Sequence, residues 1–232
     1  MSSRNASWPG DWSDTEGMER IDTKYIPEIP GAILHFSARG LPEGPMQTWY
    51  DLISGTPWSS TSGATAPLVT KDSQDNSVLY FDGIDDMFTM PLVLSQPHTI
   101  IIMAKFREYR NSSLLVSGAT GPSNTLGINS ASTGWTHYAG STLALTGVAP
   151  DTLIHTFMSV SNGANSVIAV GDLERVGDAG TNGRTFLRVG YGAGAAADYE
   201  KMNVYEVAVL PFAANATQRQ TIRDMLFEAY GF

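Results

Sequence analysis

The stretch Ser77-Val-Leu-Tyr-Phe-Asp-Gly-Ile-Asp-Asp-Met-Phe-Thr-Met90 carries the clearest structural signal in this chain of 232 residues. On either side of its central Asp-Gly pair, apolar residues alternate with polar or small ones: Leu79, Phe81, Phe88 and Met90. This period of two is typical of strands with one buried face. Gly83 suits the positive φ of a tight turn, and Asp82 suits a side-chain bond to the backbone across the bend. The stretch therefore predicts a β-hairpin.

Composition extends this prediction to the whole chain. Hydrophobic residues make up 42% of it, enough for a sizeable core, and charged residues only 16%. The 23 glycines and 12 prolines fit many short strands joined by many turns. A chain of this length suits one large β domain or two small ones. No helical periodicity is visible before residue 213, so the sequence predicts an all-β protein.

Charge, cysteine content and hydropathy exclude several partners. The net charge is −9 and no Lys/Arg cluster is present, so we expect no nucleic-acid partner. The absence of cysteine excludes disulfides and thiolate metal sites, and it favours folding in a reducing cytoplasm. The N-terminus has no apolar run of signal-peptide length. The longest apolar run, 100–104, is far short of the ~20 residues that cross a bilayer, so no membrane insertion is expected.

Strand candidates follow one another at short spacing from residue 31 onward. The longest, 98–106, is continuously apolar, which predicts a central strand buried on both faces. Two others, 153–161 and 166–172, are expected to form a hairpin across Asn162-Gly-Ala164. The remaining candidates are 32–36, 48–53, 113–117, 125–129, 135–139, 142–145, 186–191 and 199–210.

The C-terminal segment differs in kind from the strands. Five residues fall at the i, i+3, i+4, i+7 and i+8 positions of one helical stripe: Ile222, Met225, Leu226, Ala229 and Tyr230. Asn215 with Gln218 matches a capping box, and Gly231 lies where a left-handed C-cap belongs. The pattern predicts a helix, which we expect to close one end of a β-sandwich.

With these elements placed, residues 31–232 resemble a concanavalin A-like (laminin-G-like) jelly roll. Three segments carry the resemblance: the opening Pro30-Gly-Ala-Ile-Leu-His-Phe36 with Thr48-Trp-Tyr-Asp-Leu-Ile-Ser-Gly55, the motif Tyr80-Phe-Asp-Gly-Ile-Asp-Asp86, and the tail. That tail runs from Val204-Tyr-Glu-Val-Ala-Val-Leu210 through a polar link to a helix ending Glu228-Ala-Tyr-Gly-Phe232. Bacterial and phage members of the superfamily often end in this way. The resemblance implies an all-β jelly-roll sandwich of two antiparallel sheets with a C-terminal α-helix.

Residues 1–30 form a separate segment, predicted to be an extended arm. It is polar and rich in proline, and it shows neither helical nor strand period. One interpretation is a loose tail on the surface. The other is a docking arm, because Trp8 and Trp12 each have a large apolar area that is costly to leave in water. We expect both tryptophans to be buried against another chain, either a copy of this one in a closed, threefold arrangement or another virion protein.

The acidic turn offers the only candidate metal ligands in the sequence. Asp85 and Asp86 could supply oxygens to Ca²⁺, which laminin-G modules bind at the rim of the sandwich. Ca²⁺ takes about six to eight ligands, and no further matching carboxylate is identifiable. The alternative is that Asp82 and Gly83 shape a turn and the chain has no cofactor, which is the prediction preferred here.

Catalytic motifs are not found. Jelly-roll glycosidases place Glu-x-Asp-x-x-Glu on one strand, which projects the carboxylates onto a single face. Glu206 is followed here by four apolar residues, and no such spacing occurs. The four histidines, His35, His98, His137 and His155, lie in no nucleophile or zinc-protease motif. The sequence therefore predicts that the chain is not an enzyme.

A sugar site is the remaining candidate. In Thr133-Gly-Trp-Thr-His-Tyr-Ala-Gly140, a strand would place Trp135 and His137 on one face and Tyr138 on the other. Aromatic rings stack on sugar C–H faces, so these residues are candidates for the edge of a lectin groove, with Trp58 as a second loop candidate. The alternative is that these aromatic residues are core packing.

The resemblance implies a bacteriophage virion structural protein, a minor tail or surface (decoration) protein, because similar single jelly rolls occur among phage tail proteins. The predicted localisation is the virion, after synthesis in the host cytoplasm. The expected partners are other virion proteins, copies of the chain itself and a host cell-surface glycan. The alternative is a free bacterial carbohydrate-binding, lectin-like protein, and a glycosidase is a third reading.

Overall fold

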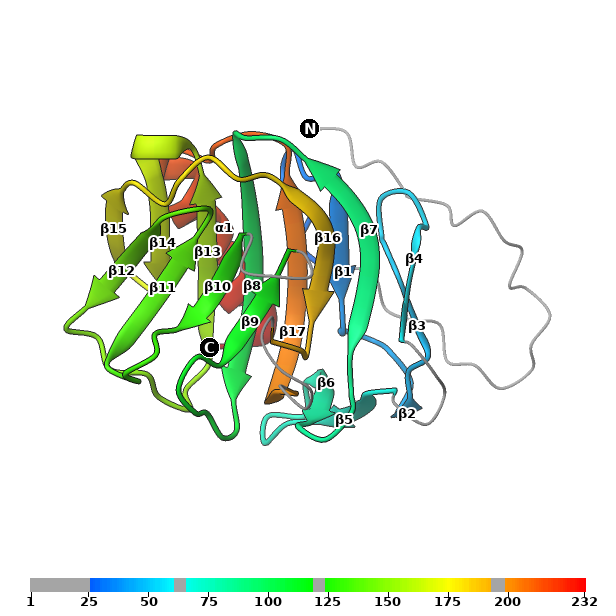
Figure 1. Ribbon diagram of the computed structural model, residues 1–232. Coiled ribbons are helices and arrows are strands. Elements are labelled where there is room, and N and C mark those ends of the chain that lie inside the picture. The colour runs from blue at the N-terminus through cyan, green and yellow to red at the C-terminus, as the bar shows by residue number, and fades with distance from the viewer. Residues whose placement is uncertain (1–25, 61–65, 119–123, 193–198) are drawn as a thin grey trace.

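The computed structural model describes residues 26–60, 66–118, 124–192 and 199–232. Most of the predicted arm, with Trp8 and Trp12, lies outside these residues. Within them, seventeen strands form two antiparallel sheets that face each other, and one α-helix lies on an outer face (Figure 1). The predicted fold class, all-β with two antiparallel sheets and a C-terminal helix, is confirmed.

The first sheet has nine described strands and carries the helix. Its spatial order is β15 (Leu173–Gly177), β14 (Ser166–Val170), β13 (His155–Ser161), β8 (His98–Phe106), β17 (Lys201–Leu210), β6 (Ser77–Asp82), β5 (Leu68–Lys71) and β2 (Gly44–Pro45). The ninth strand, β1 (Leu34–Ser37), pairs with the C-terminal half of β17, on the edge whose other half pairs with β6. Strand β8 has the predicted bounds and the predicted central place.

The second sheet has eight described strands. Its order is β12 (Thr142–Thr146), β11 (Gly134–Tyr138), β10 (Thr125–Ile128), β9 (Leu114–Ser117), β16 (Arg184–Val189), β7 (Phe88–Leu94), β4 (Pro57–Ser60) and β3 (Thr48–Tyr50). Of these, β4 was not predicted, and neither were β2, β5 and β15 in the first sheet. These four are short strands or edge strands whose apolar alternation is weak.

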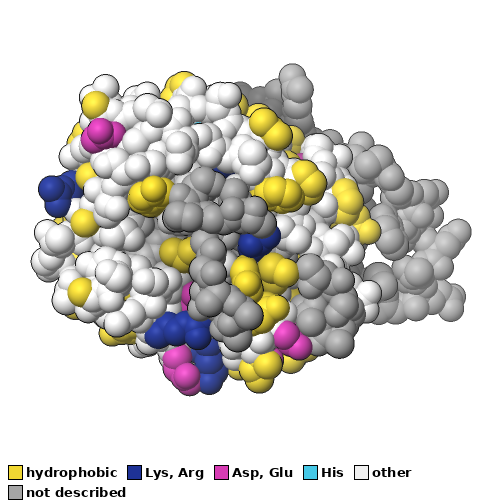
Figure 2. All heavy atoms as spheres, viewed as in Figure 1, with side chains coloured by type: hydrophobic (Ala, Val, Ile, Leu, Met, Phe, Trp, Pro, Cys, Tyr) yellow, Lys and Arg dark blue, Asp and Glu magenta, His cyan; other side chains and the backbone are white. Residues whose placement is uncertain are grey.

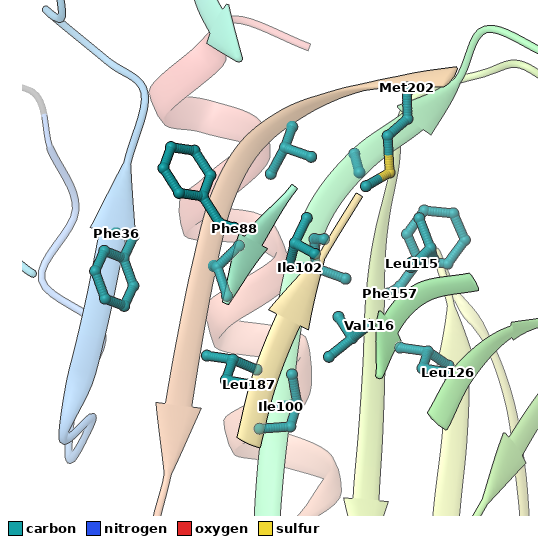
Figure 3. Packing of buried hydrophobic residues seen from close by; sticks show 14 of the residues in the cluster. Phe36, Phe88, Ile100, Ile102, Leu115, Val116, Leu126, Phe157, Leu187 and Met202 are labelled. Carbon is teal, nitrogen blue, oxygen red and sulfur yellow. The ribbon is translucent and has the colours of Figure 1, made fainter. Parts of the chain in front are cut away.

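The main core lies between the sheets. Figure 3 shows Ile100 and Ile102 of β8 beside Val116 and Leu187, which come from the facing sheet. Side chains on successive strand residues point to opposite faces, so Ile101 of β8 belongs instead to a second core under the helix. This alternation explains why the strand is apolar on both faces.

The helix α1 (Ala216–Tyr230) has the predicted caps in an unpredicted place. Asn215 and Gln218 form the capping box, and Gly231 has a left-handed φ of 73°. The buried stripe that includes Ile222 and Leu226 packs against the outer face of the nine-stranded sheet (Figure 1). The expectation that the helix closes one end of the sandwich is therefore wrong, because the apolar outer faces of β8 and β17 provide a wider surface to cover.

The stretch 77–90 is not a hairpin. Its two strands, β6 and β7, lie in different sheets, and the turn between them passes from one sheet to the other. The turn chemistry is as predicted: Gly83 has a φ of 79°, and Asp82 Oδ1 accepts the backbone N–H of Ile84 at 2.7 Å. A period of two identifies the inward-facing residues and leaves the pairing partner undetermined.

Charged side chains are sparse on the described surface in Figure 2, where Lys and Arg gather beside acidic groups at the lower end. Among the described residues, Lys201 Nζ forms an exposed ion pair with Glu108 Oε1 at 2.5 Å. No helix among the described residues is both long and apolar enough to cross a membrane.

Candidate functional site

The two predicted sugar-stacking tryptophans are core residues. Trp135 on β11 is 1% exposed and packs between Phe106 and Phe157, with ring centroids 6.2 and 4.8 Å away. Trp58 on β4 is fully buried and stacks on Trp49 at 5.9 Å. Neither ring has a face left for a sugar. The alternative, core packing, accounts for both.

The other two residues of that prediction point in opposite directions. His137 is fully buried between the sheets, and its Nε2 lies 3.1 Å from Ser161 Oγ. Burial, with the charge of Arg184 as a second cause, lowers the pKa of His137 to about 3. Tyr138 faces outward and is partly exposed. The four residues therefore form no common surface.

The predicted calcium residues do lie together, and a third carboxylate joins them. Ligand oxygens of Asp82, Asp85 and Asp86 lie within 4.8 Å of one another. Asp86 is buried, and desolvation raises its pKa to about 6. Its Oδ2 accepts the backbone N–H of Asp82 at 2.8 Å, so this carboxylate already shapes the turn. Three carboxylates fit part of a calcium shell of six to eight oxygens, so calcium stays the alternative to the preferred prediction of no cofactor, and both stay predictions.

A groove of about 540 Å³ lies along the C-terminal end of α1. Its lining combines cationic, anionic, amide and aromatic side chains: Pro27, Arg39, Asn76, Met225, Glu228, Ala229, Tyr230 and Gly231. The Arg39 guanidinium lies 5.4 Å from the centre of the Tyr230 ring. Asn76 Nδ2 donates to the Tyr230 carbonyl at 3.1 Å. A few polar groups over an apolar base are typical of small-molecule sites.

A buried carboxylate fixes the base of this groove. Glu206 on β17 is fully buried, and it accepts hydrogen bonds from Tyr230 Oη at 2.7 Å and Ser37 Oγ at 2.6 Å. His35 Nε2 lies 2.8 Å from its second oxygen. Burial and the Glu206 charge raise the pKa of Tyr230 well above its usual value, so its hydroxyl stays a donor. The network joins β1, β17 and α1.

A bulge on β17 lets the Glu206 side chain reach Tyr230 on the helix. The register against β8 shifts between Val204 and Glu206, so one residue of β17 has no partner on β8. Bulges re-aim side chains. Here Tyr205 packs with the residues under the helix, and Glu206 reaches Tyr230 on the same helix. The sequence showed Glu206 as an acid within an apolar strand, but its partners are distant in the chain and no local pattern could identify them.

No family model and no curated protein matches this chain. Solved structures do. Trypanosoma rangeli sialidase in complex with sialic acid is similar over 87% of this chain and 34% of its own, with a TM-score of 0.63 and 14% identity. The binding domain of botulinum neurotoxin DC in complex with SialylT is similar over 86% and 51%, with a TM-score of 0.56 and 10% identity. The binding domain of Paraclostridial Mosquitocidal Protein 1 is similar over 85% of this chain and 52% of its own, with a TM-score of 0.62 and 8% identity.

The chain thus spans about a third of the sialidase and about half of the two toxin structures. At these identities the similarity establishes the fold alone, a β-sandwich that also occurs in toxin binding domains.

The comparisons correct one prediction. The sequence was taken to exclude an enzyme because no jelly-roll glycosidase motif occurs in it. The sialidases among the similar structures contradict that exclusion, since the same fold occurs within enzymes. The physical reason is that one missing motif tests one arrangement of carboxylates, whereas a fold supports many.

Proposed function

We propose that this chain is a lectin-like virion structural protein of a bacteriophage, a minor tail or surface protein that binds a host cell-surface glycan. The observation that carries the glycan-binding part is the fold shared with a neurotoxin binding domain solved with SialylT. The virion part is supported by the sequence resemblance of 31–232 to jelly rolls of phage tail proteins. Trp8 and Trp12 are the proposed contacts to other virion proteins or to a second copy.

The groove beside α1 is the proposed glycan site. Arg39 and Glu228 supply a donor and an acceptor of opposite charge at its rim. Sugar hydroxyls both donate and accept, so such a mixed rim suits them. The ring of Tyr230 is fixed from beneath by Glu206. A base that does not move on binding lowers the entropy cost of ordering a ligand.

A glycan array tests this assignment. We expect the full chain to bind a subset of bacterial surface glycans, and Glu228→Ala to weaken that binding about tenfold or more. Asp224→Ala is the matched control, since Asp224 is an exposed acid on the same helix outside the groove lining. Equal binding by both variants would place the glycan elsewhere. Silence of the full chain on the array would contradict glycan binding.

The virion role needs a separate experiment. Mass spectrometry of purified particles should detect the full chain, and a chain lacking residues 1–25 should be lost from them. Normal incorporation of the truncated chain would contradict the docking arm. Glycan binding by a chain that joins no particle would favour the alternative, a free bacterial lectin.

A further inference from the structure

Arg184 is a buried cation without a partner in the described part of the chain. It begins β16, between the two sheets, and is 1% exposed. None of its three guanidinium nitrogens has a hydrogen-bond partner among the described residues. Most buried polar groups in proteins are hydrogen-bonded, so three orphaned nitrogens on one side chain require an explanation.

The charge itself needs compensation. Burial lowers the pKa of Arg184 to about 9, which leaves the guanidinium protonated at neutral pH. Buried charges in proteins are paired or bind an ion of opposite sign, because an isolated charge in a low-dielectric interior is very unfavourable. A partner of negative charge is therefore expected.

Among the described residues, the polar groups that interact with Arg184 supply no negative charge. His98 on β8 and His137 on β11 both interact electrostatically with Arg184. Burial, with the Arg184 charge as a second cause, lowers the pKa of His98 to about 4. Asn124 Nδ2 lies 3.1 Å from His98 Nε2 and 2.9 Å from Ser161 Oγ. These side chains come from both sheets and form a neutral polar cluster, whose two histidines interact electrostatically with Arg184.

The acids outside the described residues can be identified from the sequence. Residues 119–123, next to Asn124, read Ala-Thr-Gly-Pro-Ser and contain no acid. Residues 61–65 contain no acid either, and residues 193–198 contain one, Asp198. Asp198 and the acids of the N-terminal segment remain as sources within the chain, and the experiment below separates a partner within the chain from an external ion.

We propose that Arg184 binds a small inorganic anion of the chloride class, sealed between the two sheets beside Asn124 and Ser161. A guanidinium presents up to five N–H donors, and a spherical anion accepts them without a directional requirement. At 1% exposure, a monatomic ion that is enclosed during folding fits this position better than a sugar acid. The inference is independent of the proposed glycan groove, which lies on the helix side of the other sheet.

The test is the anion dependence of unfolding for the full chain at constant ionic strength. A single bound ion lowers the unfolding constant about tenfold for each tenfold rise in its concentration above the dissociation constant. We expect this dependence in chloride and bromide, and none in gluconate. Arg184→Met should remove it. Arg175→Met is the matched control, because Arg175 is exposed on β15, and this variant should keep the dependence.

A second measurement does not depend on any variant folding. Crystals grown in bromide should show an anomalous difference peak within hydrogen-bond distance of the Arg184 guanidinium. Equal stability in chloride and gluconate, with no peak, would overturn the proposal. So would an equal halide effect in Arg184→Met, which would mark a general salt effect. Loss of stability on removal of residues 1–25, without halide dependence, would assign the partner to the N-terminal acids.

Discussion

Glu206 and Arg184 are both charged, both almost completely buried and both on strands of this sandwich, yet their surroundings are opposite. Glu206 has three protein partners within 2.8 Å, which come from β1 and α1. Arg184 has none among the described residues. A satisfied buried charge joins elements of the fold, whereas an orphaned one requires a partner from outside the described residues.

The largest expected effect comes from breaking the satisfied network. Glu206→Ala removes the acceptor of Ser37 and Tyr230 and leaves His35 without its carboxylate. Removing one member of a buried charged network typically costs about 3–5 kcal/mol. We expect urea unfolding to show a loss of this size. Glu228→Ala, at an exposed acid, should change stability by less than about 0.5 kcal/mol. A small loss for Glu206→Ala would mean that its hydrogen bonds are replaced by water.

Removing the buried charge of Arg184 is expected to change stability in the opposite direction. Replacing a buried ion pair by apolar side chains of similar volume is often neutral or stabilising by about 1–4 kcal/mol, and an unpaired buried charge has less attraction to lose. We therefore expect Arg184→Met to be at least as stable as the natural chain in gluconate, with a smaller advantage in chloride. Urea unfolding in the two salts measures this. A strong destabilisation in both salts would show that Arg184, like Glu206, has a partner within the chain.

Removing one hydroxyl group from the Glu206 network should have an effect on stability of intermediate size. Tyr230→Phe removes only the hydroxyl that donates to Glu206 at 2.7 Å, and it keeps the ring against Tyr205. A hydrogen bond to a charged group is worth about 1.5–3 kcal/mol. We expect a loss of stability in this range, measured by urea unfolding, together with weaker glycan binding if the ring loses its orientation. Tyr138→Phe, at a partly exposed tyrosine, is the control.

The contrast also shows what the sequence could predict. The bounds of β8 and both caps of α1 were predicted, because they depend on neighbouring residues and on apolar patterns. The placement of β6 and β7 in different sheets was missed, since alternation does not identify a pairing partner. The partners of Glu206 lie 24 to 171 residues away in the chain. Such contacts exist only after folding, so sequence patterns did not reveal them.

The tryptophans failed as site predictions for a related reason. An aromatic residue on a strand has the same sequence signature whether its ring faces the core or a ligand. Trp135 and Trp58 lie on inward-facing positions, which only the register of β11 and β4 decides. The pattern correctly placed Trp135 and His137 on one face, but that face is the interior.

Asp86 is intermediate between Glu206 and Arg184 in how far its charge is compensated, and the expected effect on stability is smaller. Its pKa is raised from 3.8 to about 6, mainly by desolvation, so the folded state favours the protonated acid. Between pH 4 and 6 the folded state binds more protons at this group than the unfolded state, and the stability contributed by Asp86 falls as the pH rises. Asp86→Asn removes this titration and keeps an oxygen for the Asp82 N–H.

We therefore expect Asp86→Asn to be about 1 kcal/mol more stable to unfolding than the natural chain at pH 7, and little more stable at pH 4. The value at pH 7 is smaller than the full pKa shift implies, because solvent near the turn screens the charge. Calcium reverses this expectation, because a bound cation favours the ionised carboxylate and stabilises the folded state by mass action. Thermal unfolding at pH 7 with and without Ca²⁺ measures both effects, and Asp151→Asn is a control distant from the turn in sequence. Stabilisation by Ca²⁺ that is lost in Asp86→Asn would establish the cluster of Asp82, Asp85 and Asp86 as a metal site. If Asp86→Asn raises stability equally with and without Ca²⁺, the three carboxylates bind no calcium and serve only to shape the turn.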